Sequence, residues 1–119
     1  MIYSNLPVFK LAYDLNIELF LVVKKFEREY KYTLGEDMKK LSLRLIINIY
    51  KANRDTRTKE AFILEARANL EEIRLLIRIT KDLRVLSLKK FVALQEKIEP
   101  ISKQLSSWYN FEVKNNARI

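Results

Sequence analysis

The sequence contains no histidine and no cysteine among its 119 residues. Without histidine, the chain lacks the commonest general base, the imidazole metal ligands and the Glu-x-x-His pairs that build di-iron sites in helical bundles. Without cysteine, it has no disulfides, thiolate metal sites or thiol nucleophiles. The single glycine excludes a glycine-rich phosphate-binding loop. We therefore predict that the protein is not an enzyme and has no catalytic residues, no metal and no cofactor.

Proline and long apolar runs are also scarce. Only two prolines occur, and charged residues make up 32% of the chain, which favours long helices joined by few turns. No apolar run reaches the roughly 18 residues that a membrane span requires. The first residues lack the basic region and cleavage site of a signal peptide. We expect one cytoplasmic domain that does not associate with a membrane.

Apolar residues recur at spacings of three and four, which predicts amphipathic helices at about 7–26, 34–53, 58–83 and 88–109. Thr33 and Glu36 form a candidate capping box before the second helix, and Ser87 is a candidate cap of the fourth. Pro100 interrupts the fourth helix, but the apolar stripe keeps its phase, so we predict one kinked helix. The predicted fold is all-α, an up-down-up-down antiparallel four-helix bundle over residues 1–109. Residues 110–119 are predicted to form a frayed or disordered tail.

Several predicted helices carry a second apolar stripe that a monomeric bundle would expose to water. In the first helix this stripe contains Phe9, Tyr13, Ile17, Phe20 and Val23. An exposed apolar patch usually marks a partner surface. We therefore predict a homo-oligomer whose interface includes Leu43, Ile46, Tyr50, Leu75 and Ile79.

The formal net charge is +8, and positive charge attracts polyanions. Two groups of cations each fall within an arc of about 60–80° on their helix. They are Lys40, Arg44, Lys51 and Arg54 in the second helix, and Arg67, Arg74, Arg78 and Lys81 in the third. Such rows can follow a phosphate backbone, so we predict that these eight residues bind nucleic acid, RNA or DNA. The alternative is a solvated helix face on which Lys and Arg stems cover apolar flanks.

The tyrosines offer a second route to nucleic acid. Tyr30 and Tyr32 flank Lys31 in the turn between the first two long helices, where their rings can stack on bases of single-stranded RNA. Tyr13 and Tyr50 lie on apolar stripes, where packing is the more ordinary role.

Several stretches resemble a known family. They are LPVFKLAYDL at 6–15, YTLG at 32–35, the pair AN at 52–53 and NLEEIRLLI at 69–77, and Trp108 extends the match. Together they resemble the accessory variability proteins of diversity-generating retroelements. These belong to a wider four-helix bundle family that includes proteins encoded in intervening sequences of large-subunit ribosomal RNA genes. The similarity covers about residues 6–109 and consists of helical patterns without catalytic motifs.

The resemblance implies a ring-like homopentamer of basic bundles. It also implies binding to nucleic acid and to a reverse transcriptase, which needs this partner for mutagenic cDNA synthesis from template-repeat RNA. The ribosomal relatives often carry a small residue and a Glu-Gly motif after the second helix, whereas residues 52–55 here read ANRD, which favours the retroelement branch. A protein of the ribosomal intervening-sequence type and a structural oligomer with no nucleic-acid role remain alternatives. An RNA-processing enzyme is a third, against which the missing histidine and cysteine argue.

Overall fold

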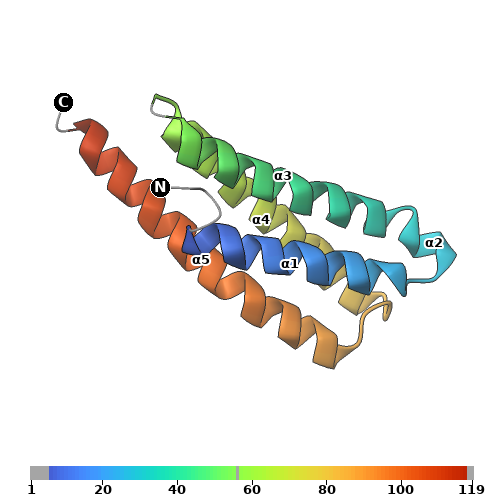
Figure 1. Ribbon diagram of the computed structural model, residues 1–119. Coiled ribbons are helices and arrows are strands. Elements are labelled where there is room, and N and C mark those ends of the chain that lie inside the picture. Colours follow the sequence, from blue (N-terminus) through green and yellow to red (C-terminus); the bar gives the residue numbers. More distant parts are fainter. Residues whose placement is uncertain (1–5, 56, 118–119) are drawn as a thin grey trace.

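The structure is a computed structural model that describes residues 6–55 and 57–117. Within these ranges the chain forms four long helices and one short one, without strands. The helices are α1 (Pro7–Lys24), α2 (Arg28–Lys31), α3 (Leu34–Arg54), α4 (Lys59–Asp82) and α5 (Leu88–Ala117). Figure 1 shows the long helices running alternately up and down, with the short α2 at one end. Each long helix packs against two others, in the closed order α1, α3, α4, α5. The predicted antiparallel four-helix bundle is confirmed.

The centre of the bundle is built from the apolar stripes that the sequence predicted. Fully buried side chains come from every long helix: Leu15 and Leu19 from α1, Met38, Leu45 and Ile49 from α3, Ile63, Leu70, Ile73 and Ile77 from α4, and Leu94, Ile98 and Ile101 from α5. Removing one such side chain from water stabilises the fold by about 1.5–3 kcal/mol. The stripes therefore both select the helical fold and supply most of its driving force.

Two polar pairs inside the bundle join neighbouring helices. Asn16 Nδ2 donates to Ser42 Oγ at 2.6 Å between α1 and α3, and Asn48 Nδ2 donates to Asn69 Oδ1 at 2.8 Å between α3 and α4. An unpaired buried polar group costs about 1–3 kcal/mol. Each pair therefore favours one register of its two helices over a slipped one.

The turn between α1 and α3 differs from the prediction. The first helix ends at Lys24, two residues earlier than expected, and the charged segment after it forms α2. The predicted capping box is wrong, because Thr33 Oγ1 donates to the carbonyl oxygen of Glu29 at 2.8 Å and does not cap α3. The Glu36 carboxylate turns to Lys39, with its Oε1 at 2.8 Å from Nζ. This ion pair lowers the pKa of Glu36, chiefly through the side-chain hydrogen bond from Lys39.

Gly35, the single glycine, allows the start of α3 to approach the end of α1. It is buried, and a Cβ atom built on it lies only 2.5 Å from Cγ1 of Val23 and 3.2 Å from the carbonyl oxygen of Tyr30. Carbon atoms normally approach to about 3.5–4.0 Å. The glycine is therefore required by close packing, since its φ is not positive.

The connection from α4 to α5 is formed by a residue with a positive φ and by backbone hydrogen bonds. Arg84 has a φ of 61°, the left-handed conformation in which helices often end. The backbone N–H groups of Val85 and Leu86 both donate to the carbonyl oxygen of Thr80, at 2.9 and 3.2 Å. Ser87 then caps α5, as predicted, by accepting from the N–H of Lys90 at 3.1 Å.

The C-terminal segment also differs from the prediction. Pro100 lies inside one helix, as expected, but α5 does not fray at residue 110 and continues to Ala117. Asn116 in the added turns donates to Glu60 in the first turn of α4, and just before these turns Arg67 Cζ lies 5.2 Å from the centre of the Tyr109 ring. These partners are distant in sequence, which explains why local periodicity did not reveal the extra turns. Positions 118 and 119 of the predicted tail, like positions 1–5 of the predicted domain, lie outside the described residues.

Candidate nucleic-acid interface

The first group of predicted cations follows the outer side of α3. We call Lys40, Arg44, Lys51 and Arg54 the α3 row. Lys40, Arg44 and Arg54 are exposed and Lys51 is half-buried. Lys51 Nζ lies 5.7 Å from the centre of the Phe62 ring, and Arg54 Cζ lies 5.3 Å from that of Tyr50. Within residues 6–55 and 57–117, none of the four forms an ion pair. Their positive charge is therefore not neutralised by a direct partner on the described surface.

Two carboxylates lie close to the α3 row without pairing with it. Lys40 and Arg44 line a shallow groove between α3 and α4, together with Asp37 and Glu72. These anions reduce the positive potential at the groove, so the outward-pointing parts of the row are the better contacts for a polyanion.

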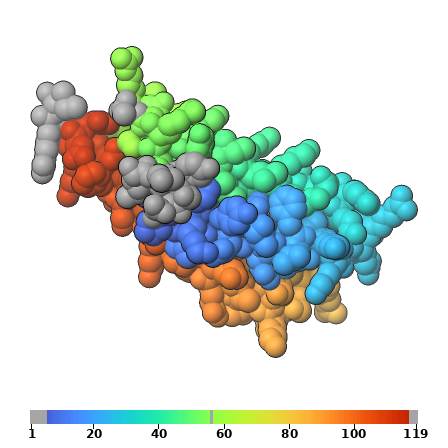
Figure 2. Space-filling model, in the orientation of Figure 1, coloured from blue at the N-terminus to red at the C-terminus, as the bar shows by residue number. Residues whose placement is uncertain are grey.

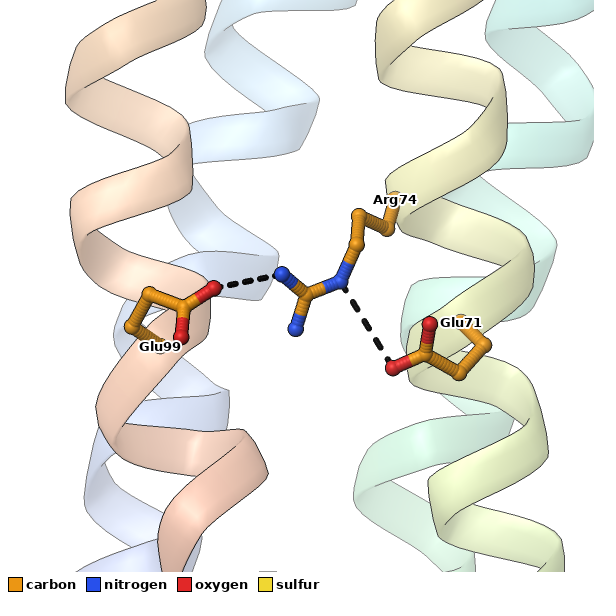
Figure 3. Close-up of polar contacts among 3 residues, drawn as sticks. All are labelled: Glu71, Arg74 and Glu99. Atoms are coloured by element: carbon orange, nitrogen blue, oxygen red, sulfur yellow. Dashed lines mark hydrogen bonds and ion pairs between the residues drawn. The ribbon is translucent and has the colours of Figure 1, made fainter.

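The second group of predicted cations has a different position. We call Arg67, Arg74, Arg78 and Lys81 the α4 row. Arg74 reaches across to α5, where its Nη1 lies 2.5 Å from Oε1 of Glu99, while its Nε lies 3.6 Å from Oε1 of Glu71 (Figure 3). Since only 27% of the Arg74 side chain is exposed, this guanidinium is largely committed to the two carboxylates.

The other members of the α4 row also have partners. Arg67 lies over the Tyr109 ring, and Lys81 Nζ lies 4.8 Å from the centre of the Phe91 ring, both on α5. Lys81 and Arg78 approach Asp82 at 3.4 and 3.9 Å, and Arg78 keeps 72% of its side chain exposed. Three members of the α4 row, Arg67, Arg74 and Lys81, therefore contact α5, whereas the ion-pair partner of Arg78 is on its own helix.

The predicted interface residues are also divided between two places. Leu43 is 44% exposed on α3, Ile46 packs against the core, and Tyr50 is half-buried. Leu75 is exposed and Ile79 half-buried on α4. Because α3 packs against α4 and Leu75 lines the groove between them, the two groups are close in the fold, and their role in an interface stays a prediction.

Exposed apolar side chains also gather along α1 and α3. The exposed side chains Tyr13, Ile17 and Phe20 of α1 and Leu43 and Ile47 of α3 make up what we call the outer apolar face. The Asn16–Ser42 hydrogen bond and the contact of Lys39 Nζ with the Phe20 ring, at 5.4 Å, join the two helices along this surface. Figure 2 shows the side of the bundle on which α1, in blue, lies between α3, in teal to green, and α5, in orange. The second stripe predicted for the first helix had indicated the α1 half, but two of its members do not belong to this face: Val23 is buried in the core and Phe9 packs against it.

Asp55 organises the turn after the α3 row. Its Oδ1 accepts the backbone N–H groups of Thr58 and Arg57, at 2.8 and 2.7 Å. These two bonds, with a smaller effect of Arg54, lower the pKa of Asp55. The carboxylate thus ties Arg57 and Thr58 to the end of α3, beside the exposed Arg54.

The arrangement offers surfaces for binding. In the described part of the chain no three carboxylates gather in a way that could hold a metal ion. No helix there is both long and apolar enough to cross a membrane. These features define a basic helical bundle with a cation-bearing helix and an exposed apolar face.

Comparison with known protein families identifies the family to which the chain belongs. The family described as bAvd-like matches residues 8–112, which include all of the four long helices except Pro7 and the last five residues of α5. The chain belongs to this family, in agreement with the resemblance to accessory variability determinants seen in the sequence. This is a family of accessory proteins of a non-catalytic type. No curated protein shows a significant match to the chain.

Proposed function

We propose that this protein is a non-catalytic accessory factor of a diversity-generating retroelement that binds nucleic acid through the α3 row. In this role it supports a reverse transcriptase during mutagenic cDNA synthesis in the cytoplasm. Membership of the bAvd-like family supports the retroelement assignment. The observation that carries the nucleic-acid part is the α3 row itself, whose cations have no ion-pair partner among the described residues.

The length of the α3 row suits a phosphate backbone. From Lys40 to Arg54 the helix rises about 21 Å, at 1.5 Å per residue. That distance corresponds to about six steps of one DNA strand at 3.4 Å each. The α4 row is a weaker candidate, because Arg74 would first have to leave Glu99 and Glu71. We therefore assign phosphate contacts to α3.

Charge reversal on α3 tests this assignment. We expect Lys40→Glu with Arg44→Glu to weaken binding of an RNA or DNA oligonucleotide by at least about tenfold, since each lost phosphate contact removes favourable counterion release. The matched control is Lys97→Glu with Lys103→Glu, which makes the same change in net charge at exposed positions of α5. Fluorescence anisotropy at a fixed salt concentration measures the oligonucleotide affinity of both variants. Equal losses in the two variants would show that net charge alone matters and would refute a site on α3.

The outer apolar face supports the oligomeric part of the proposal. We propose that a second copy of the chain covers this face and that copies close into a ring, the pentamer implied by the family resemblance. Leu43→Asp places a charge on the face and should lower the mass measured by light scattering. Leu64→Asp, at an exposed leucine of α4 away from the face, is the control. An unchanged mass for Leu43→Asp would exclude this face as the interface.

The reverse transcriptase is the remaining proposed partner. The direct test is cDNA synthesis from template-repeat RNA by the cognate enzyme, with and without this protein. We expect synthesis to require it, and we expect the Lys40→Glu, Arg44→Glu variant to support less synthesis than the α5 control. If both variants support full synthesis, a structural oligomer without a nucleic-acid role becomes the better account.

A further inference from the structure

A hollow lies where the end of α1, the short α2 and the start of α3 meet. We call it the corner pocket, and its walls include Phe20, Lys24, Lys31, Tyr32 and Lys39. In Figure 1 this corner is the end of the bundle that carries α2. Three ammonium groups and two aromatic rings thus surround one concave site.

The described walls of the corner pocket carry positive charge and no negative charge. Within residues 6–55 and 57–117, Lys24 and Lys31 form no ion pair, and the walls include no carboxylate. Lys39 differs, because its ammonium is shared between Glu36 and the Phe20 ring. By contrast, the groove between α3 and α4 includes Asp37 and Glu72. The corner pocket therefore suits an anion better than that groove does.

The exposed ring of Tyr32 offers a stacking surface, which a ligand that is only an anion would not use. Its side chain is 64% exposed, although a tyrosine is usually stabilised by burying its ring. An exposed ring beside cations is the combination that proteins use to bind single strands, in which bases stack on aromatic side chains and phosphates meet positive charge. In a duplex the base faces are already stacked, so such a ring finds no partner there.

The corner pocket is also held in place by the fold. Tyr30, two residues before Tyr32, packs against the core, and Thr33, the residue after it, donates to Glu29. The close approach at Gly35 fixes the start of α3 against Val23, which is itself part of the pocket wall. The backbone that carries Tyr32 is therefore fixed before a ligand binds, which lowers the entropy cost of binding.

We propose that the corner pocket binds an unpaired nucleotide of a single-stranded nucleic acid, with the base stacked on Tyr32 and the flanking phosphates bound by Lys24 and Lys31. The inference rests on the proposed function and names the form of nucleic acid that the protein takes. Lys39 lines the pocket and Lys40, the next residue, begins the α3 row.

The test compares Tyr32→Leu with Tyr32→Phe, which keeps a ring that can stack. The probes are a single-stranded oligonucleotide of about twelve nucleotides and a duplex of the same length, a size within the range that single-strand sites cover. We expect Tyr32→Leu to weaken single-strand binding about tenfold and to change duplex binding less than twofold. Tyr32→Phe should bind both probes like the wild type. Because Tyr32 is exposed, circular dichroism should show all three proteins equally folded.

The outcomes separate the inference from the function on which it rests. If the wild type binds the single strand and Tyr32→Leu binds it equally well, the pocket assignment is wrong and the proposed function stands. Equal losses of single-strand and duplex binding in Tyr32→Leu would also overturn the inference, since stacking on an unpaired base predicts a selective loss. If the wild type binds neither probe, the proposed function fails and the inference fails with it.

Discussion

Replacing Gly35 by alanine tests the close packing that joins α1 to α3 at the corner of the bundle. The added Cβ would lie 2.5 Å from Cγ1 of Val23, a residue that is 1% exposed and whose β-branched side chain has few alternative rotamers in a helix. That separation is about 1 Å shorter than an ordinary carbon contact. A helix normally gains from this substitution, since alanine is favoured over glycine by up to about 1 kcal/mol. The two effects therefore oppose each other.

The sizes of these two effects determine whether the substitution stabilises or destabilises the fold. Overpacking a core typically costs about 1–3 kcal/mol, and the gain in helix propensity offsets at most about 1 kcal/mol of it. We expect Gly35→Ala to lower the free energy of unfolding by about 1 kcal/mol. Urea denaturation followed by far-ultraviolet circular dichroism measures this change, and the slope of the transition should stay constant.

A double-mutant cycle with Val23→Ala shows whether the clash is the cause. Val23→Ala alone removes buried methyl groups and should cost about 2–3 kcal/mol. In that background Cγ1 is absent, so Gly35→Ala should become neutral or stabilising by up to about 1 kcal/mol. The same destabilisation by Gly35→Ala in both backgrounds would refute the steric explanation.

Three further predictions concern the turn at Arg84, the loop at Asp55 and the buried pair at Asn16. Arg84→Gly should raise the free energy of unfolding by about 1 kcal/mol, because glycine adopts the left-handed conformation without a Cβ penalty. A melting temperature below that of the wild type would contradict this. The lowered pKa of Asp55 stabilises the fold above the ordinary value of 3.8, and this contribution is lost as the pH falls through the folded-state pKa. The advantage of wild type over Asp55→Asn in melting temperature should therefore shrink below about pH 4, whereas a constant difference from pH 7 to pH 3 would show no linkage. Asn16→Ala should cost about 1–3 kcal/mol because it leaves the Ser42 hydroxyl buried and unpaired, and adding Ser42→Ala should recover part of that loss.

The sequence was most informative where structure depends on local periodicity. The stripes that contain Leu15, Leu45, Ile73 and Ile98 identify the core side of each long helix without any knowledge of its neighbours. Ser87 was also identified correctly, because an N-cap depends on only a few adjacent residues.

The ends of α2 and α3 show where local rules failed. The same hydroxyl of Thr33 had two acceptable uses, capping α3 or bonding the carbonyl of Glu29, and the packing of α2 against the core selected the second. Likewise, the last turns of α5 carry Asn116, which bonds Glu60 of α4, a residue far away in the chain. Neither choice is determined by nearby sequence alone.

The candidate site was predictable only helix by helix. The spacing grouped the cations into rows along each helix, but a row reveals nothing about which helix will lie beside it. Arg74 and Glu99 are 25 positions apart, so their ion pair appears only when α4 packs against α5. The corner pocket has the same origin, because Lys24 and Tyr32 come together through a turn that the sequence suggested only as a charged segment.

The salt dependence of nucleic-acid binding tests the central claim most directly. Two variants are compared with the wild type, one with every cation of the α3 row replaced by glutamine and one with every cation of the α4 row replaced in the same way. Each phosphate contact contributes about 0.7–0.9 to the slope of log affinity against log salt concentration. We predict that the α3 variant loses about 3 units of slope, whereas the α4 variant, of which only Arg78 is mostly exposed, loses about 1 or less. An equal or larger loss in a folded α4 variant would contradict the assignment of the phosphate contacts to α3.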